Sequence, residues 1–265
     1  MTGNKAVSYE TILYEKQSGV ATITLNRPQA LNAFTPQMNL EFQDALKDGD
    51  ADSNVRCFLI TGAGRAFCAG QDLKGRTKEQ RGSLGESLRE RYNPMILRIR
   101  RTEKIVVAGV NGVAAGAGCN LALACDLRVA SEEARFIQAF VRVGLAPDSG
   151  GSFFLPRLVG LSKAFELLLL GDPVDAREAL RIGLVAKVVP AAEFPAAMKE
   201  IAERIGRGPR STGLIKRALN RSLLPELEAQ LDYEACLQEI AGRSADYDEG
   251  VRAFLEKRTP VFTGK

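Results

Sequence analysis

Apolar positions along the first 190 residues change repeatedly between a period of two and a period near 3.6. Residues 9–25 alternate on either side of Ser18-Gly19, and this pattern predicts a β-hairpin. Thr35 followed by Pro36 predicts the start of a helix, with Thr35 as its capping residue. Continuous apolar runs predict further buried strands at 55–61, 105–110, 126–130 and 184–189. Strands that alternate with helices in this way indicate an α/β fold.

From about residue 193 onward, the apolar positions keep only the helical spacing. Amphipathic helices are predicted at 193–206, 211–222, 225–242 and 245–258. Upstream, a helix is predicted over 88–101 with four apolar side chains facing inward, Leu88, Met95, Ile96 and Ile99, although Pro94 interrupts its pattern. The polar residues 48–54 are predicted to end the helix that begins at Pro36. We therefore divide the chain into an α/β core, residues 1–199, and a helical part, residues 200–265, that is expected to mediate oligomerisation.

Two glycine-bearing turns each follow a predicted strand. The stretch 105–130 combines a strand, a glycine-rich turn, a short apolar helix and a second strand. Gly112, Gly116 and Gly118 let the backbone approach a ligand and open a helix whose first amides lack internal partners. The other turn, residues 61–73, directly follows the strand at 55–61. Two turns that each aim a backbone N–H at one point would form an oxyanion hole, and we expect the site to be organised around it.

Two polar segments accompany these turns. Residues 74–86 are polar and contain glycine, so we expect a mobile loop over the site. The sequence Pro147-Asp148-Ser149-Gly150-Gly151 predicts a turn that leads into a new helix. Asp148 is therefore either the N-cap of that helix or a carboxylate with a chemical function. Asp175 is likewise predicted to cap a helix, which ends at Gly183.

Composition excludes several classes of chemistry. The 265 residues include no histidine, which removes Ser-His-Asp and Cys-His catalysis and imidazole metal sites. The five cysteines lack C-x-x-C spacing, so neither a metal site nor a disulfide framework is expected. Acid–base chemistry must then rest on carboxylates, tyrosine or lysine.

Charge and hydropathy limit the classes of partner that are expected. The net charge of +4 is small for this length, and the basic residues of 207–221 are better explained by a solvated helix face or by contacts with the phosphates of a small ligand. No nucleic-acid partner is therefore expected. The N-terminus has no secretory pattern, and no run reaches the roughly 18 apolar residues of a membrane span. These features predict a cytoplasmic protein that does not enter the membrane.

Three motifs in order, FCAGQDL, VNGVAAGAGCNLALACD and APDSGGSFFLPRLVG, resemble the enoyl-CoA hydratase/isomerase (crotonase) superfamily. The opening LNRPQALNAF and the terminal EGVRAFLEKRTPVF match it as well, so the resemblance covers essentially the whole chain. It implies a spiral of ββα units with a C-terminal helical trimerisation region, assembled as a trimer or as a hexamer formed by two trimers. It also implies an acyl-CoA substrate, with coenzyme A as part of the substrate and no metal or redox cofactor.

The resemblance also carries roles to positions of this chain. The two oxyanion amides of the family match Ala69 and Ala117. The family's acyl and pantetheine tunnel, its nucleotide contact and its C-terminal CoA contacts match Gly70, Gln71, Asp72, Leu73, Gly116, Ala30, Phe254 and Lys257. The C-terminal pair reaches CoA from the same or a neighbouring subunit in the family, whereas simple helix packing is the alternative reading of Phe254.

Departures from the family pattern bear on the reaction. The two glutamates of hydratases are replaced by Asn120 and Phe140, neither of which takes up or gives a proton at neutral pH. Asp148 remains as a carboxylate in motif register, as in isomerase branches of the family. A single carboxylate over an enolate can remove a proton from one carbon and return it to another. Asn120 would position the acyl group or hydrogen-bond the aspartate.

A narrower resemblance is to the branch that isomerises 1,2-epoxyphenylacetyl-CoA to oxepin-CoA in phenylacetate catabolism. Three aromatic side chains, Phe136, Phe140 and Phe153, would line the pocket of an aromatic acyl group, and ordinary core packing is the alternative for each. A Δ3,Δ2-enoyl-CoA isomerase of fatty-acid β-oxidation would use the same residues. A hydratase-like enzyme and a catalytically silent binding subunit of the same fold are further alternatives.

Overall fold

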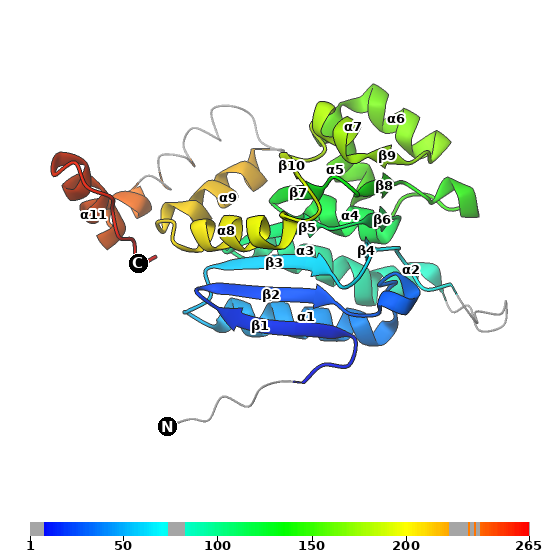
Figure 1. The fold of residues 1–265 in the computed structure, drawn as a ribbon, viewed down its shortest axis with the longest axis horizontal. Helices are drawn as coiled ribbons and strands as arrows, with labels where there is room; N and C mark the ends of the chain where they lie inside the picture. The colour runs from blue at the N-terminus through cyan, green and yellow to red at the C-terminus, as the bar shows by residue number, and fades with distance from the viewer. Residues whose placement is uncertain (1–7, 74–82, 223–232, 234–235, 237–238, 265) are drawn as a thin grey trace.

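The computed structural model describes residues 8–73, 83–222, 233, 236 and 239–264. Within this part of the chain there are two sheets, and helices surround them (Figure 1). The larger sheet has six strands in the order β1-β2-β3-β5-β7-β10, and the smaller has four in the order β4-β6-β8-β9. All neighbouring pairs are parallel except β1 with β2 and β8 with β9. The α/β expectation is therefore confirmed.

The predicted hairpin and the first helix form one edge of the molecule. Strands β1 (Ile12–Gln17) and β2 (Val20–Leu25) pair antiparallel around Ser18 and Gly19, both of which have positive φ angles. The η1 turn (Pro28–Ala30) leads to α1 (Pro36–Ala51), where the Thr35 hydroxyl accepts a hydrogen bond from the Met38 amide. The cap is thus as predicted. The helix continues to Ala51 and so includes the first four residues of the polar segment that was expected to end it, because solvated polar side chains are compatible with a helix face.

The middle of the chain repeats one supersecondary unit. In three repeats a strand of the large sheet is followed by a strand of the small sheet and then by helices, and in the last one the strand of the small sheet and a helix precede the strand of the large sheet. The strands of the large sheet are β3 (Cys57–Gly62), β5 (Ile105–Val110), β7 (Leu127–Ser131) and β10 (Lys187–Val189). The strands of the small sheet are β4 (Ala66–Cys68), β6 (Val113–Ala115), β8 (Arg135–Ile137) and β9 (Val174–Asp175). This is the spiral of ββα units that the resemblance implied.

The helices between these strands largely follow the sequence expectations. Among the described residues they are α2 (Leu84–Ser87), η2 (Leu88–Tyr92), α3 (Asn93–Arg101), α4 (Ala117–Ala124), η3 (Val141–Val143), α5 (Gly151–Val159), α6 (Leu161–Leu170) and α7 (Ala176–Arg181). The predicted helix over 88–101 begins as a π-helical segment, after which Pro94 occupies the first turn of α3, where it removes no hydrogen bond. The loop expected at 74–86 lies outside the described residues as far as 82, and α2 begins at Leu84. Asp175 caps α7 by accepting from the Glu178 amide.

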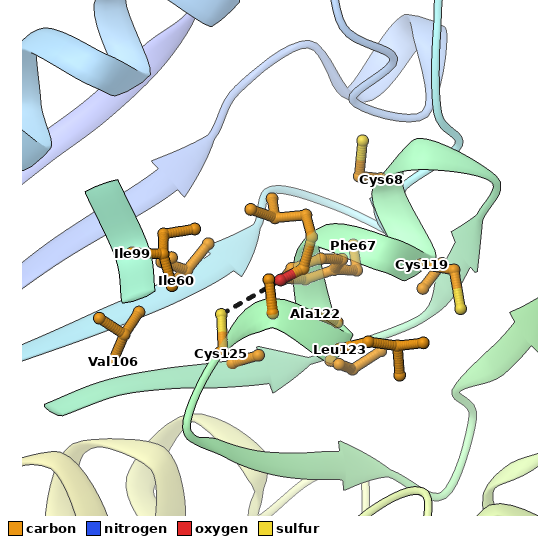
Figure 2. Packing of buried hydrophobic residues seen from close by; sticks show 14 of the residues in the cluster. Ile60, Phe67, Cys68, Ile99, Val106, Cys119, Ala122, Leu123 and Cys125 are labelled. Carbon is orange, nitrogen blue, oxygen red and sulfur yellow. Dashed lines mark hydrogen bonds between the residues drawn. The ribbon is translucent and has the colours of Figure 1, made fainter. Parts of the chain in front are cut away.

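The short helix α4 is the centre of the main core. All eight of its residues are buried, and they pack with side chains of β3, β4, β5 and α3. Figure 2 shows Ala122, Leu123 and Cys125 among Phe67, Ile60, Ile99 and Val106, with the Cys125 thiol donating to the Leu121 carbonyl. A helix that is apolar on every face must be enclosed, so the start of α4 is held rigidly against both sheets.

The opposite face of the large sheet is covered by α8 (Phe194–Gly206). Phe194, Met198 and Ala202 pack there against Val107, Val129 and other side chains of the sheet. The expected domain boundary at residue 199 falls inside this helix. The helices α9 (Ser211–Arg221) and α11 (Ala245–Leu255) follow as predicted. Most of the helix expected at 225–242, namely residues 225–232, 234–235 and 237–238, lies outside the described residues. No helix in the described part of the chain has the length and apolar character needed to cross a membrane.

A buried aspartate joins the last residues of the chain to the start of α9. Asp246, 2% exposed, accepts hydrogen bonds from the amides of Arg210, Thr263 and Gly264 at 2.6 to 3.0 Å. Burial by itself would raise the pKa of Asp246, but these backbone hydrogen bonds outweigh it and the net pKa is lowered. The carboxylate form is therefore the one that stabilises this arrangement.

We predict that Asp246→Asn lowers the free energy of unfolding by about 1–3 kcal/mol at pH 7, because an amide NH₂ would face backbone donors. Urea unfolding monitored by circular dichroism measures the change. Since the pKa is lowered in the folded state, the contribution is complete above the ordinary aspartate pKa of about 4 and is lost as the pH falls further. Asp248→Asn, an exposed change on the same helix, is the control and should stay within about 0.5 kcal/mol. Equal effects of the two substitutions would contradict the prediction.

Candidate functional site

The two glycine-bearing turns meet where β4 ends and α4 begins. A Cβ atom on Gly70 would lie 2.8 Å from the Ala115 carbonyl oxygen and 3.5 Å from the Ala117 nitrogen. A Cβ on Gly118 would overlap the Cys68 carbonyl oxygen. Only glycine allows the two backbones to approach so closely. The expectation that both turns contribute to one place is therefore consistent with their positions in the structure.

The first amides of α4 provide one hydrogen-bond donor to this place. Gly116 precedes the helix with a φ of 51°, and because it has no side chain it cannot cap the helix. The Ala117 amide has no hydrogen-bond partner among the described residues, as expected for the first turn of a helix. It carries the partial positive charge of the helix N-terminus, and Ala117 itself is 4% exposed. This amide retains the capacity to donate to a developing negative charge.

The Ala69 amide is already used elsewhere, which corrects the expectation for this residue. It donates to the Leu31 carbonyl oxygen at 2.9 Å, so it is engaged with the segment after η1. Two residues on, Gln71 forms a parallel bridge with Phe34, in which the bonding groups are the Gly70 carbonyl and the Asp72 amide. In such a bridge the N–H of the middle residue points away from the partner strand. The Gln71 amide is therefore directed to the side of β6 and α4.

The residues expected to contact CoA lie around this strand segment. Ala30 ends the η1 turn, and the Arg27 guanidinium joins that turn to the site by donating to the Ala33 carbonyl and to Asp72 at 2.9 Å. Asp72 thus has a structural role in the chain, as one partner of an ion pair. Leu73 is 55% exposed at the edge of the described residues. Leu31, which follows Ala30, accepts a hydrogen bond from the Ala69 amide, so the η1 turn adjoins this segment, and a contact of these residues with CoA stays a prediction.

Asp148 lies in the turn between η3 and α5, next to Asn120 of α4. It does not cap α5, because the N-cap position is occupied by Gly150 and receives no side-chain hydrogen bond. Its Oδ1 accepts instead from the Ser149 hydroxyl at 2.9 Å. Burial raises the pKa of the Asp148 carboxyl, and the Ser149 hydrogen bond offsets this in part. A partly buried carboxyl with a raised pKa is suited to proton transfer rather than to ion pairing.

Asn120 of α4 is enclosed in the core, and both polar atoms of its amide are already hydrogen-bonded. It is 0% exposed, and its Nδ2 donates to the Asp148 carbonyl oxygen at 2.8 Å. Its Oδ1 accepts from the Gln138 Nε2 at 2.9 Å. Of the two roles considered for Asn120, the contact with the aspartate is the one observed, through the backbone of Asp148. Gln138 carried no signal in the sequence that would have identified it.

The three phenylalanines have different environments. Phe136 is 2% exposed and belongs to the main core, which matches the packing alternative. Phe140 is 6% exposed, and its ring lies near the position where a Cβ on Gly116 would be, at 3.8 Å. Phe153 lines a cavity of about 670 Å³ together with Phe154, Gly150 and Ile96. The rings of Phe153 and Phe154 meet edge to face at 5.2 Å, and Phe154 was not expected at this wall.

The C-terminal positions are not brought to the site within one chain. Phe254 lies in α11 and Lys257 follows it as an exposed residue. Figure 1 shows α11 at the opposite end of the molecule from β4, β6 and α4. A contact of these residues with CoA would therefore have to come from a neighbouring subunit, and it stays a prediction.

Comparisons with known proteins agree with this geometry. A family model described as enoyl-CoA hydratase/isomerase matches residues 15–265. The chain is 45% identical to a 1,2-epoxyphenylacetyl-CoA isomerase of Escherichia coli, over 97% of this chain and 99% of that protein. It is also 45% identical to a probable enoyl-CoA hydratase of Rhodobacter capsulatus, over 98% and 100%. A solved enoyl-CoA hydratase/isomerase structure from Mycobacterium abscessus, described as putative, superposes with a TM-score of 0.91 at 38% identity, over 96% of this chain and all of that one. The chain belongs to the enoyl-CoA hydratase/isomerase family.

Proposed function

We propose that this family member is an acyl-CoA isomerase that converts 1,2-epoxyphenylacetyl-CoA to oxepin-CoA. The observation that carries the proposal is the distribution of carboxyl groups around α4. Position 120 holds a buried amide and position 140 a phenyl ring, while Asp148 supplies a partly buried carboxyl with a raised pKa. Hydration requires one group to activate water and another to protonate carbon, whereas isomerisation requires one group that returns the proton it removed.

In this proposal the thioester carbonyl accepts hydrogen bonds from the amides of Ala117 and Gln71. Loss of the α-proton turns that carbonyl into an enolate oxygen, and two fixed donors stabilise the charge as it develops. The closeness of Gly70 to the Ala117 nitrogen supports this pairing, since the two amides belong to segments in contact. Gln71 thereby takes the role that the motif alone assigned to Ala69. Coenzyme A enters as part of the substrate.

The proton route follows from a single carboxylate. Asp148 accepts the α-proton as the enolate forms, and the epoxide ring expands to the oxepin as the electrons rearrange. Asp148 then returns the same proton to a ring carbon, so that the atoms of substrate and product balance. A carboxyl with a raised pKa is a stronger base than an ordinary aspartate and remains able to donate afterwards.

One relative supports the aromatic substrate over an aliphatic one. The isomerase of Escherichia coli named above aligns over nearly its whole length. The aliphatic alternative has its own support, because the chain is 37% identical to a trans-2-decenoyl-[acyl-carrier-protein] isomerase of Streptococcus mutans. A Δ3,Δ2-enoyl-CoA isomerase would use Asp148 and the same two amides.

We also propose that the protein is a homo-oligomer, a trimer or a hexamer formed by two trimers. One face of α6 exposes Leu161, Phe165 and Leu169, each more than half accessible in the single chain. Apolar side chains clustered on one helix face are expected to be covered by a partner. Such assembly would also allow Phe254 and Lys257 of one subunit to approach CoA bound to the next.

We predict that the wild-type protein isomerises 1,2-epoxyphenylacetyl-CoA and does not hydrate crotonyl-CoA. Asp148→Asn should lower kcat about 10²–10⁴-fold, because an amide cannot accept the proton. Absorbance of the thioester and chromatography of the product measure both reactions, with 3-hexenoyl-CoA as the aliphatic comparison. A preference for 3-hexenoyl-CoA would select the Δ3,Δ2-isomerase instead. Rapid hydration of crotonyl-CoA would contradict the single-carboxylate mechanism.

The raised pKa of Asp148 predicts the pH dependence of the reaction. The ionised carboxylate is the active base, so kcat/KM should rise with pH, and the midpoint of this limb should lie above the usual aspartate value of 3.8. Steady-state rates between pH 4 and pH 9 measure it. The limb should be absent from the residual activity of Asp148→Asn, and a rate independent of pH down to 4 in the wild type would speak against Asp148 as the base.

We predict that Gly70→Ala lowers kcat on the order of 10²-fold or more, because the new methyl group would displace the segment that carries the Gln71 amide. Gly19→Ala is the matched control. Gly19 also has a positive φ, of 78°, but a Cβ there meets only ordinary contacts in the β1–β2 turn. The control should lose some stability and keep its kcat. Equal losses of kcat in the two variants would indicate general strain and not an oxyanion hole.

A further inference from the structure

The turn that carries Asp148 has an unfavourable backbone conformation. Ser149 has a φ of 50° and Gly150 a φ of 79°, so two successive residues are left-handed. The turn is closed by the Gly151 amide, which donates to the Asp148 carbonyl oxygen at 2.8 Å. A residue other than glycine in the left-handed region persists only when its surroundings hold it there. Something outside the turn must therefore contribute to its geometry.

That contribution comes from two buried side-chain amides, one of which bonds to the turn and the other to the first amide. Asn120 donates its Nδ2 to the Asp148 carbonyl oxygen at 2.8 Å, and a Cβ on Gly151 would overlap this same amide. The turn thus rests directly on Asn120. Gln138, 4% exposed at the end of β8, donates its Nε2 to the Asn120 Oδ1 at 2.9 Å. Asn120 belongs to α4 and Gln138 directly follows β8, so both amides are attached to elements of the core.

Gln138 determines which way the Asn120 amide faces. With the Gln138 NH₂ on its oxygen, Asn120 must present its own NH₂ to the Asp148 carbonyl. The Gln138 Oε1, in contrast, has no hydrogen-bond partner among the described residues. A buried acceptor without a partner costs free energy, so a residue chosen for stability alone would not be expected here. The arrangement is explained if the donor on Asn120 is what matters.

We propose that Gln138 is a positioning residue of the isomerase, which acts through Asn120 to hold the Asp148 turn over the acyl group. The proposal rests on the proposed function. Neither amide touches the substrate, since Asn120 is fully buried and Gln138 lies behind it. Asn120, at the position of one hydratase glutamate, therefore supports the turn that carries Asp148, the carboxyl group proposed to act as the base. The effect is expected in the chemical step and not in the binding of CoA.

Two substitutions test the direction of the hydrogen bonds. Gln138→Met keeps the length of the side chain but removes the donor, and kcat should fall about tenfold with KM nearly unchanged. Gln138→Glu keeps the shape, donates only when it is protonated, and otherwise turns the Asn120 amide around. The ratio of its kcat to that of the wild type should therefore be high at low pH and fall as the pH rises. Two other titratable groups lie near Gln138. The Cys119 thiol, whose pKa burial raises to about 12, accepts a hydrogen bond from the Gln138 side chain, and Asp172 lines a small cavity together with Gln138 and Cys119.

Asn39→Leu is the control for loss of a buried amide. Asn39 is 1% exposed on α1, and its Oδ1 also lacks a partner among the described residues. This variant should lose stability with no change in the kcat of the folded protein. If Gln138→Met behaves in the same way, or if the Gln138→Glu ratio does not change with pH, the proposal is overturned.

Hydrogen exchange of the Gly151 amide provides a readout that does not depend on activity. It should accelerate at least severalfold in Gln138→Met and stay unchanged in Asn39→Leu, because only the former releases the turn. Unchanged exchange in Gln138→Met overturns the proposal, as does faster exchange with an unaltered kcat. If the wild type acts on none of the thioesters, the proposed function fails, while the exchange data still decide whether Gln138 holds the turn.

Discussion

The structure depends on the close approach of backbone to backbone between the β4 and β6 segments. At Gly62, Gly112 and Gly118 an added Cβ would overlap a carbonyl oxygen of the neighbouring segment. β4 and β6 are neighbouring strands of one sheet, and the absence of side chains at these glycines lets the turns that flank the strands meet backbone to backbone. That contact places the Gly70–Gln71 peptide beside the first turn of α4, and the buried packing of α4 keeps it there. The two amides of the candidate oxyanion hole are therefore fixed before any ligand arrives.

A second constraint is the isolation of charge around the site. The ion pair of Arg27 and Asp72 holds the edge of the strand segment, while Asp148 has a hydroxyl as its side-chain partner in the described part of the chain. Its proton affinity is thus set by burial and not by a neighbouring cation. A buried charge on α9 shows the contrast. Lys216, 3% exposed, contacts Asp126 at 2.7 Å and two backbone carbonyls, and so joins α9 to the core.

Much of the fold could be predicted because local signals and tertiary packing agree. Thr35 and Asp175 cap the helices that their positions indicated, and the apolar run 105–110 is strand β5. Of the two amides of the candidate oxyanion hole, only one could be identified from the sequence. Ala117 follows from its place in the first turn of a helix, but which amide of 69–71 is directed to the site depends on the bridge between Phe34 and Gln71, a contact between distant segments. The hydrogen bonds of the buried Asn120 amide likewise could not be predicted, because they involve Gln138, a residue that no sequence motif singles out.

The packing and hydrogen bonds of Asn120 also limit which substitutions the site can accept. Its amide fills the space beneath Gly151 and satisfies one donor and one acceptor, so a glutamate there would be too long and would lose both bonds. A return to a two-glutamate site would require Gln138 and the Asp148 turn to change together with residues 120 and 140. Under the proposed function, this site is therefore separated from a two-glutamate hydratase site by several coupled substitutions.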